Sequence, residues 1–415
     1  MRRWPVLAAG FGLNLTLGTV YSWSVFIKPL QARFGASYFE AALPSTLALG
    51  LFAVGMLVAG RWVNRLGPRT VASLGAILVG SGYLASAAAV FLPSPMLALS
   101  LAYGVLVGLG IGFAYSPPIP AAARWFPERK GLATGIVVMG FGLSPLVTAP
   151  LVNSLLGLYG VEWTFAGLGA VFLTVGLLLA AFLRFPPADF VPPVTAKKAV
   201  PIPPSDIPPR AVLRRREYYL TLGLYALGTS VGFMAISQAK TLATEVTHLE
   251  AWVAVAAVQW LAVWNCAGRP LFGRLADAWG LRTVLWGMFG LELVGMAALL
   301  YAASAGALLL GIALVAVVFG GFLAVMPALT AQFFGTRDLA ANYGLVFLGY
   351  GAGGLLGPVL IGAVRDATGD FSLAFALGMV LCAVGLALAT FVRPPKRLPS
   401  PELPPIPTKA PPRSA

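Results

Sequence analysis

Apolar stretches of about 20 residues alternate with short polar or charged segments along the whole chain. A stretch of this length matches the number of helical residues needed to cross the hydrocarbon core of a bilayer. The pattern predicts twelve transmembrane helices, six on each side of a longer polar interval. They cover residues 4–27, 43–62, 71–92, 96–119, 132–158, 163–183, 218–237, 251–272, 284–303, 307–329, 343–364 and 371–392.

The polar interval differs in kind from the other connections because it is rich in proline and basic residues. Proline interrupts helices and favours an extended chain, so this interval is typical of a linker. The tail from Arg393 has a similar composition, and we expect it to be disordered. We therefore predict an N-terminal six-helix bundle at residues 1–184, a cytoplasmic linker at 185–217, a C-terminal six-helix bundle at 218–392 and a cytoplasmic tail at 393–415.

Composition supports an all-α polytopic membrane protein. Of the 415 residues 59% are hydrophobic and only 10% are charged, whereas soluble domains carry about 25% charged residues. The formal net charge is +14, which in a soluble protein would suggest nucleic acid as a partner. Here the basic residues lie between the apolar stretches and not on one face of a domain, so we expect the lipid bilayer and not nucleic acid as the partner.

The positive-inside rule predicts the orientation. With a cytoplasmic N-terminus, the linker, the tail and most basic loop residues face the cytoplasm. No cleavable signal follows Met1, so we expect the first stretch to remain as a helix. The expected location is the cell membrane, as a multi-pass protein of the prokaryotic inner membrane with both termini cytoplasmic. Only four basic residues then face outward, namely Lys28, Arg33, Lys240 and Arg365.

The sequence lacks the residues that a metal site or an ATP-binding site would need. Cys266 and Cys382 lie in apolar stretches and are typical of packing residues, and the single His248 cannot build a metal site. No P-loop sequence is present, which argues against an ATP-driven pump. We therefore expect no enzyme activity, no metal and no cofactor.

The two halves of the chain contain matching loops. Residues 60–70 read GRWVNRLGPRT and residues 273–283 read GRLADAWGLRT, with Gly, Arg, Gly, Arg and Thr at the same places. Residues 125–129 (WFPER) and 333–337 (FFGTR) form a second pair before the fifth and eleventh stretches. Two matches in the same order indicate an internal repeat.

The first of these loops resembles the signature loop of the major facilitator superfamily, G-x-x-x-D-R-x-G-R-[RK]. The resemblance includes the helix count and the linker position, and it implies two six-helix bundles that transport by alternating access. The sequence departs from the pattern at Asn64, where an acid is expected. By the resemblance the polar loop residues form a gating latch, although the charges can also serve only as topology signals. These residues are Arg61, Asn64, Arg65, Arg69, Arg274, Asp277 and Arg282.

Two charged residues lie far inside predicted helices, where a charge costs about 2.5 to 3.5 kcal/mol. Arg269 carries a planar guanidinium that matches a carboxylate, and Gly268 and Pro270 are expected to loosen the helix around it. The alternative is that Arg269 extends its side chain to the cytoplasmic interface. Glu292 is the other embedded charge, and it is either a structural partner or a proton-coupling site.

The sequence N-x-x-x-R-P at residues 265–270 resembles the monocarboxylate transporter branch of the superfamily and its microbial relatives, the oxalate/formate antiporters. Further matches are GTVYSWSVF at 18–26, GIGFAY at 110–115, and FGTR followed by NYG at 334–344. By this resemblance Arg269 pairs with the substrate carboxylate, while Tyr21 and Tyr115 line the cavity.

Two departures from this branch bear on the substrate. Tyr350 stands where the oxalate antiporters have a second cation, a lysine, and one cation suits a monocarboxylate better than a dicarboxylate. Asn265 stands where animal monocarboxylate carriers have an aspartate that is thought to take the proton, so the proton must use Glu292 or the substrate itself.

These observations predict a monomeric secondary active transporter of small monocarboxylates such as lactate, pyruvate, acetate or formate, coupled to protons. Three alternatives stay open. They are an exchanger for oxalate, formate or another short organic acid, an efflux carrier for an unrelated hydrophobic solute, and a non-transporting membrane receptor or sensor. A receptor would usually append a soluble signalling domain, and a cation-drug exporter should carry acids within the first six helices.

Overall fold

The computed structural model describes residues 3–187, 189–190, 206–245, 251–302 and 304–393. Within these residues every regular element is a helix. His248 lies outside the described residues, as do residues 188 and 191–205 of the predicted linker and nearly all of the predicted tail.

The described chain confirms the all-helical membrane fold. Seven helical segments are long and apolar enough to cross a membrane. Two of them, α3 (Tyr38–Ala89) and α7 (Lys130–Ala180), are broken into two spans each by a non-helical glycine, at Gly67 and Gly160. The first, seventh and eighth spans come from further helices, and the total is twelve.

The first span of the N-terminal half consists of two α-helices joined by a short 3-10 helix. Besides α3 and α7 this half contains α1 (Trp4–Leu17), η1 (Gly18–Ser22), α2 (Ser24–Phe34), α4 (Pro95–Leu99), η2 (Ser100–Val107), α5 (Gly108–Tyr115), α6 (Pro118–Trp125) and η3 (Pro127–Arg129).

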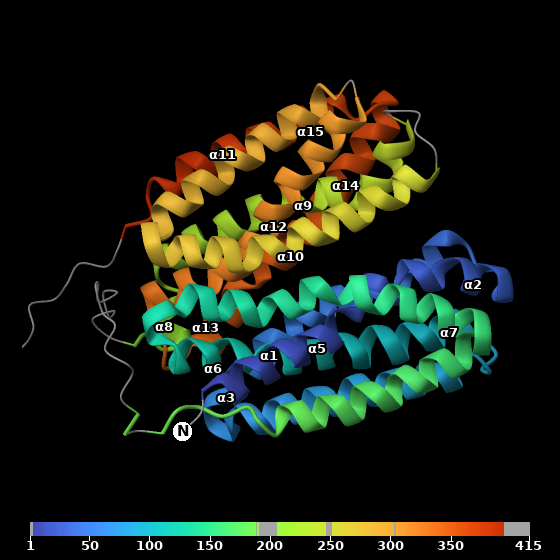
Figure 1. Cartoon of the computed structure of the whole chain (residues 1–415), viewed down its shortest axis with the longest axis horizontal. Helices are drawn as coiled ribbons and strands as arrows, with labels where there is room; N and C mark the ends of the chain where they lie inside the picture. Colours follow the sequence, from blue (N-terminus) through green and yellow to red (C-terminus); the bar gives the residue numbers. More distant parts are fainter. Residues whose placement is uncertain (1–2, 188, 191–205, 246–250, 303, 394–415) are drawn as a thin grey trace, which may run out of the picture.

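The C-terminal half follows a short helix after the linker. Its elements are α8 (Pro209–Val212), α9 (Arg216–Glu245), α10 (Ala251–Trp279), α11 (Leu281–Leu300), α12 (Ala305–Phe334), α13 (Leu339–Val346), α14 (Leu348–Thr368) and α15 (Ser372–Ala389). Helices α1 to α7 form one bundle and α9 to α15 form the other (Figure 1).

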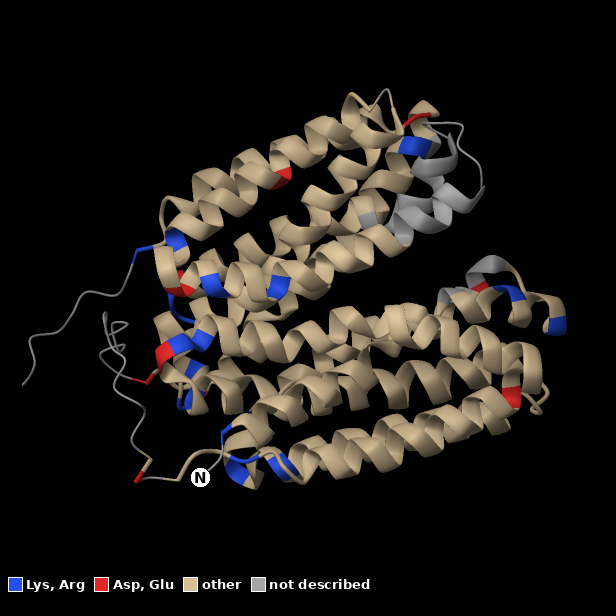
Figure 2. Cartoon of the chain, in the orientation of Figure 1, with Lys and Arg blue, Asp and Glu red and all other residues tan. Residues whose placement is uncertain are grey.

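Charged residues gather at the helix ends and leave the middle of both bundles almost uncharged (Figure 2). Arginine and lysine concentrate at the end of the molecule where the N-terminus and α8 lie. We call this the basic end. The helices of the two bundles lie closer together there than at the opposite end, near α2 (Figure 1).

The repeat seen in the sequence has the same backbone in both halves. Gly67 has φ 82° and ψ 158°, and Gly280 has φ 86° and ψ 151°. Other residues rarely adopt a positive φ of this kind, which explains why glycine occupies the same place in both loops. Each glycine reverses the chain at the basic end, between the second and third spans and between the eighth and ninth.

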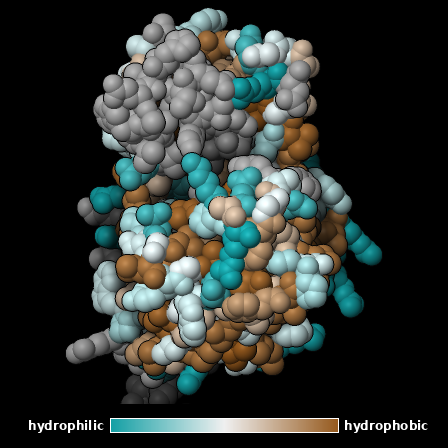
Figure 3. All heavy atoms as spheres, turned by 90° about the vertical axis from the view of Figure 1, so that its right-hand side faces the viewer, coloured by the Kyte–Doolittle hydropathy of each residue, from teal (hydrophilic) through white to brown (hydrophobic). Residues whose placement is uncertain are grey.

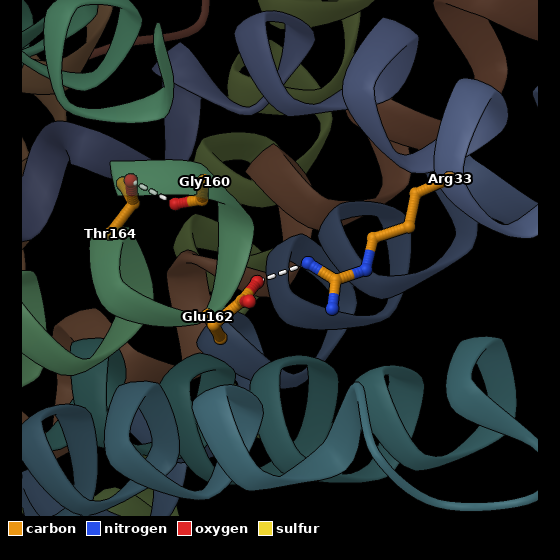
Figure 4. A network of polar contacts seen from close by, with 4 residues as sticks. All are labelled: Arg33, Gly160, Glu162 and Thr164. Atoms are coloured by element: carbon orange, nitrogen blue, oxygen red, sulfur yellow. Dashed lines mark hydrogen bonds and ion pairs between the residues drawn. The ribbon is translucent and has the colours of Figure 1, made fainter. Parts of the chain in front are cut away.

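The end opposite the basic end is held by local polar contacts. Arg33 at the end of α2 forms an ion pair with Glu162, which follows the break at Gly160, and the Thr164 hydroxyl donates to the Gly160 carbonyl at 2.7 Å (Figure 4). Seen from this end, hydrophilic residues lie among hydrophobic ones (Figure 3). These contacts fasten the first span to the turn between the fifth and sixth.

Helix α3, which leaves this end of the molecule, begins with a capping box. The Glu40 amide donates to the Ser37 hydroxyl oxygen at 3.2 Å, and the Ser37 amide donates to the Glu40 carboxylate at 2.8 Å. These reciprocal bonds satisfy two of the free amides at the start of α3. The hydrogen bonds from Ser37 lower the pKa of Glu40.

Candidate functional site

Five predicted site residues from both bundles meet at one level of the molecule. Arg269 lies ten residues before the end of α10 at Trp279, which places it about 15 Å along the helix from the basic end. That is roughly half the thickness of the hydrocarbon core. We call this group the Arg269 site. It consists of Arg269 and Asn265 on α10, Tyr21 on η1, Tyr115 on α5 and Tyr350 on α14.

The Arg269 side chain is fully buried, with an exposed fraction of 0%. Its Nε and Nη2 donate to the Asn265 Oδ1 at 3.3 and 3.1 Å, and its Nη1 donates to the carbonyl of Val138 on α7. A side chain that extended to the interface would be exposed, so the snorkelling alternative is wrong for this structure. Instead, the guanidinium joins the C-terminal bundle to the N-terminal one.

No described carboxylate forms an ion pair with Arg269. A guanidinium has five N–H donors, and the described contacts occupy three of them, so two remain. A buried cation without an anionic partner is costly. This combination is typical of a site that receives an anion.

The helix around Arg269 is not loosened as expected. Helix α10 continues through Pro270, and a methyl group added at Gly268 would collide with the carbonyl of Val317 on α12. The expectation that Gly268 and Pro270 open the helix was therefore wrong. Gly268 instead allows two helix backbones to approach closely.

Three tyrosines from both bundles contribute hydroxyls to the site. The hydroxyls of Tyr21 and Tyr350 lie 2.5 Å apart. The Tyr115 hydroxyl is buried and has no partner among the described residues. The guanidinium lies against Gly142, and the ring of the neighbouring Phe141 packs on Tyr21 and Tyr115. Within the described residues the site thus combines one permanent cation, at least one unpaired hydroxyl donor, and no acid.

Phenylalanine rings form the walls of this site. The Phe141 ring packs edge-on against Tyr21 at 5.1 Å and against Tyr115 at 5.3 Å, while Phe347 stacks on Tyr350 at 4.7 Å. Phe52 lies 5.0 Å from Phe347 and so links the walls of the two bundles. These rings leave the site apolar except for the guanidinium, the Asn265 amide and the hydroxyls.

Our sequence analysis missed these phenylalanines. One signal was present, because residues 343, 347 and 350 are all aromatic and share one helix face at spacings of four and three. Nothing in the sequence distinguished Phe52 or Phe141 from other buried rings.

Glu292 lies apart from the Arg269 site. It is fully buried on α11, and neither carboxylate oxygen has a hydrogen-bond partner among the described residues. Phe289 and Met296 on the same helix pack against Gly385 and Gly378 of α15, and no described ion pair joins Glu292 to Arg269. The structure does not bring the proton-coupling candidate to the predicted substrate residues.

Two members of the predicted latch contact the opposite bundle at the basic end. The Asn64 amide donates to the Arg337 carbonyl at 2.5 Å and to the Asp338 carboxylate at 2.7 Å, and its oxygen accepts from Arg124 at 3.1 Å. The Asp277 carboxylate accepts from the amides of residues 131 and 132 at the start of α7, both at 2.9 Å.

The other predicted latch residues are exposed and form no hydrogen bond or ion pair within the described chain. They are Arg61, Arg65, Arg69, Arg274 and Arg282. Sequence reasoning overlooked Arg124, which besides Asn64 reaches the carbonyls of Thr336 and Arg337 at 3.1 and 2.5 Å.

The chain is similar to known membrane transporters. A family model described as the Major Facilitator Superfamily matches residues 7–265 and 220–414. An uncharacterized MFS-type transporter of Escherichia coli, YhjX, is 33% identical over 85% of this chain and 86% of its own. The oxalate:formate antiporter of Oxalobacter formigenes is 27% identical over 91% and 88%.

Two further similarities extend the comparison. Human monocarboxylate transporter 11 is 30% identical over 96% of this chain and 84% of its own. The crystal structure of the transporter FucP in its outward conformation has a TM-score of 0.71 at 16% identity, and covers 93% of this chain and 98% of that one. At this identity the structural likeness concerns the fold.

Proposed function

The chain belongs to the major facilitator superfamily, and from this premise we propose that it is a secondary active transporter of small monocarboxylates with proton coupling. One observation carries the proposal. Arg269 is buried at mid-depth between the two bundles, has two N–H donors left, and meets no described carboxylate. A substrate carboxylate would supply the missing counter-charge.

The charge and the lining of the site favour a short acid with one carboxylate. A single guanidinium neutralises one negative charge, and the unpaired Tyr115 hydroxyl offers one more donor. The rings of Phe52, Phe141 and Phe347 line the site and suit a small apolar group. Lactate, pyruvate, acetate and formate meet these conditions. The similarity to human monocarboxylate transporter 11 supports the same substrate class.

The second candidate function is the exchange of oxalate, formate or another short organic anion. The similarity to the oxalate:formate antiporter favours it. A dicarboxylate brings two charges into a water-poor site, and Tyr350 cannot offset the second one. For this reason we place monocarboxylate transport first.

We further propose that the basic end faces the cytoplasm and that the two bundles rock about the Arg269 site. In this structure Asn64, Asp277 and Arg124 link the bundles at the basic end. Substrate would then reach the site from the opposite side. Opening of the basic end must break these contacts, while Glu292 is our candidate for the residue that takes the proton.

Uptake by purified protein in proteoliposomes tests the substrate class. A charge-assisted pair contributes about 1.5 to 3 kcal/mol, or roughly ten- to a hundredfold in affinity. Arg269→Lys keeps the charge but loses the planar fork, so it should retain weak uptake of labelled L-lactate. Arg269→Ala should abolish saturable uptake. Arg214→Ala, which removes an exposed arginine outside the latch and the site, is the matched control.

A labelled panel of lactate, pyruvate, acetate, formate and oxalate, with and without a pH gradient, separates the two candidate functions. Uptake that is driven by an inward proton gradient supports symport. Uptake that requires a second organic anion preloaded inside the vesicle supports exchange. Wild-type affinity in well-folded Arg269→Ala would contradict both.

A further inference from the structure

The guanidinium of Arg269 lies directly on the backbone of α7 from the other bundle. Its Nη1 donates to the Val138 carbonyl, and Gly142 lies one helical turn beyond Val138. A Cβ atom placed on Gly142 would lie 2.9 Å from both the Cζ and the Nε of Arg269 and 3.1 Å from its Nη2. Real Cβ atoms do not approach so closely, so the space that a side chain at position 142 would need is already filled by the guanidinium.

Helix geometry explains why this glycine matters for Val138. A helical side chain leans toward the N-terminus and covers the turn that precedes its own Cα. A side chain at position 142 would therefore lie over the turn of Val138. Glycine leaves the Val138 carbonyl uncovered, so the carbonyl can accept a hydrogen bond from outside its own helix.

From these contacts we propose that Gly142 is a positioning residue for the substrate site. It allows α7 to hold the Arg269 guanidinium between the Val138 carbonyl and the Asn265 amide oxygen. The two free N–H donors are thereby kept at a fixed place between the bundles. This inference rests on the proposed role of Arg269 in binding a carboxylate, and it adds a residue that contacts no substrate itself.

Gly142 differs from the glycines that only let helices approach. Gly135 lies about two helical turns before Gly142 on α7, toward the basic end. An added Cβ there would lie 2.6 Å from the backbone carbonyl of Arg269. Helix α7 would have to move away from α10 to admit it. At Gly142 the three nearest atoms all belong to the far end of one flexible side chain. A methyl group there should displace the guanidinium and leave the helices packed.

Because Val138 and Arg269 belong to different bundles, their bond exists only while α7 lies against α10. In the proposed transport cycle these helices separate when the basic end opens. The guanidinium would then lose its α7 support, and the affinity for substrate would differ between the two states. Gly142 therefore links substrate affinity to the state in which the basic end is closed.

Kinetics of L-lactate uptake in proteoliposomes test the proposal. Gly142→Ala should raise KM by about tenfold, the factor for losing one hydrogen bond to a charged group, with a smaller change in the maximal rate. Gly157→Ala is the matched control on the same helix, because a Cβ there meets no atom within 4 Å. The apparent melting temperature of the purified protein without substrate should stay close to that of the wild type.

A double-mutant cycle with Arg269→Lys separates positioning from packing. Lysine lacks the Nη1 and Nη2 atoms through which Arg269 bonds Val138 and Asn265, so Gly142→Ala should have little further effect on KM in the Arg269→Lys background. If Gly142→Ala fails to fold, Arg269→Ala should rescue folding, because alanine lacks the Nε, Cζ and Nη2 atoms that the new methyl would meet. Additive effects on KM, or a failure of this rescue, would overturn the proposal.

The remaining outcomes separate this inference from the proposed function. If Arg269→Lys lowers affinity but Gly142→Ala transports with the wild-type KM, the positioning role is wrong and the carboxylate site stands. If Arg269→Lys and Arg269→Ala both keep the wild-type KM, the proposed function fails and this inference fails with it.

Discussion

The hydroxyl of Tyr21 in the N-terminal bundle lies 2.5 Å from the hydroxyl of Tyr350 in the C-terminal bundle. The two residues are 329 positions apart in the sequence. Both rings border the Arg269 site, where Tyr21 packs against Phe141 and Tyr350 stacks on Phe347. This bond joins the two bundles through neutral groups and makes position 350 a place where charge can be added.

Replacing Tyr350 by lysine should shift selectivity toward dicarboxylates. A second cation beside Arg269 would offset the second charge of oxalate, and one charge-assisted bond is worth about tenfold in relative affinity. Competition of oxalate against labelled lactate measures the shift. Tyr350→Phe, which removes the bond to Tyr21 without adding charge, is the control. An unchanged ratio in Tyr350→Lys would show that position 350 does not contact the substrate.

Substituting Glu292 by glutamine should alter proton coupling more than substrate exchange. The side chain is fully buried without a described partner, and glutamine keeps its size but cannot carry a proton. We expect gradient-driven uptake to lose its pH dependence, whereas exchange of internal for external substrate continues. Glu217→Gln, at the start of α9, is the control. The wild-type pH dependence in Glu292→Gln would remove Glu292 from the mechanism.

Asn64 stands where the family's signature loop has an acid. Replacing it by aspartate should weaken the contacts that hold the basic end closed. Asn64 donates to the Asp338 carboxylate and accepts from Arg124, and an aspartate cannot do both. In Asn64→Asp two carboxylates would face each other and destabilise the closed basic end. Arg124 would offset only part of this repulsion.

Cysteine alkylation measures this effect. A reporter placed at Ala340, which is buried where α13 packs against Gly60 of α3, should react several-fold faster in Asn64→Asp, because it is exposed only when the basic end opens. Adding Asp338→Asn should restore slow labelling. If Asn64→Asp leaves the rate unchanged, the Asn64 contacts do not hold the bundles together.

The orientation of the chain is open to a direct test. Basic residues gather at the end that holds α8 (Figure 2), and the positive-inside rule places this end in the cytoplasm. A cysteine at exposed Arg210 should resist impermeant reagents in intact cells, whereas one at Tyr159, exposed at the opposite end, should react. Both are introduced into a chain without Cys266 and Cys382. The reverse pattern would invert the proposed topology.

The sequence by itself determined the membrane fold and its two-fold repeat. Hydropathy is a local property, so twelve apolar stretches could be counted without knowing how they pack. The glycines at positions 67 and 280 marked the same turn in both halves, and their matching positive φ angles bear this out. Arg269 was recognisable in the same way, because an embedded cation stands out against an apolar background. Its role in transport remains a prediction.

Only the tertiary structure decided which faces of these helices meet. In a bilayer nearly every face of a helix is apolar, so periodicity does not show which face is turned to lipid and which to a neighbour. The carbonyl of Val138 and the space at Gly142 leave no mark in side-chain chemistry, yet they hold Arg269 from the other bundle. The separation of Glu292 from the site likewise depends on how α11 packs against its neighbours. A contact between distant segments is set by how two whole helices cross, and the residues of one helix alone do not determine it.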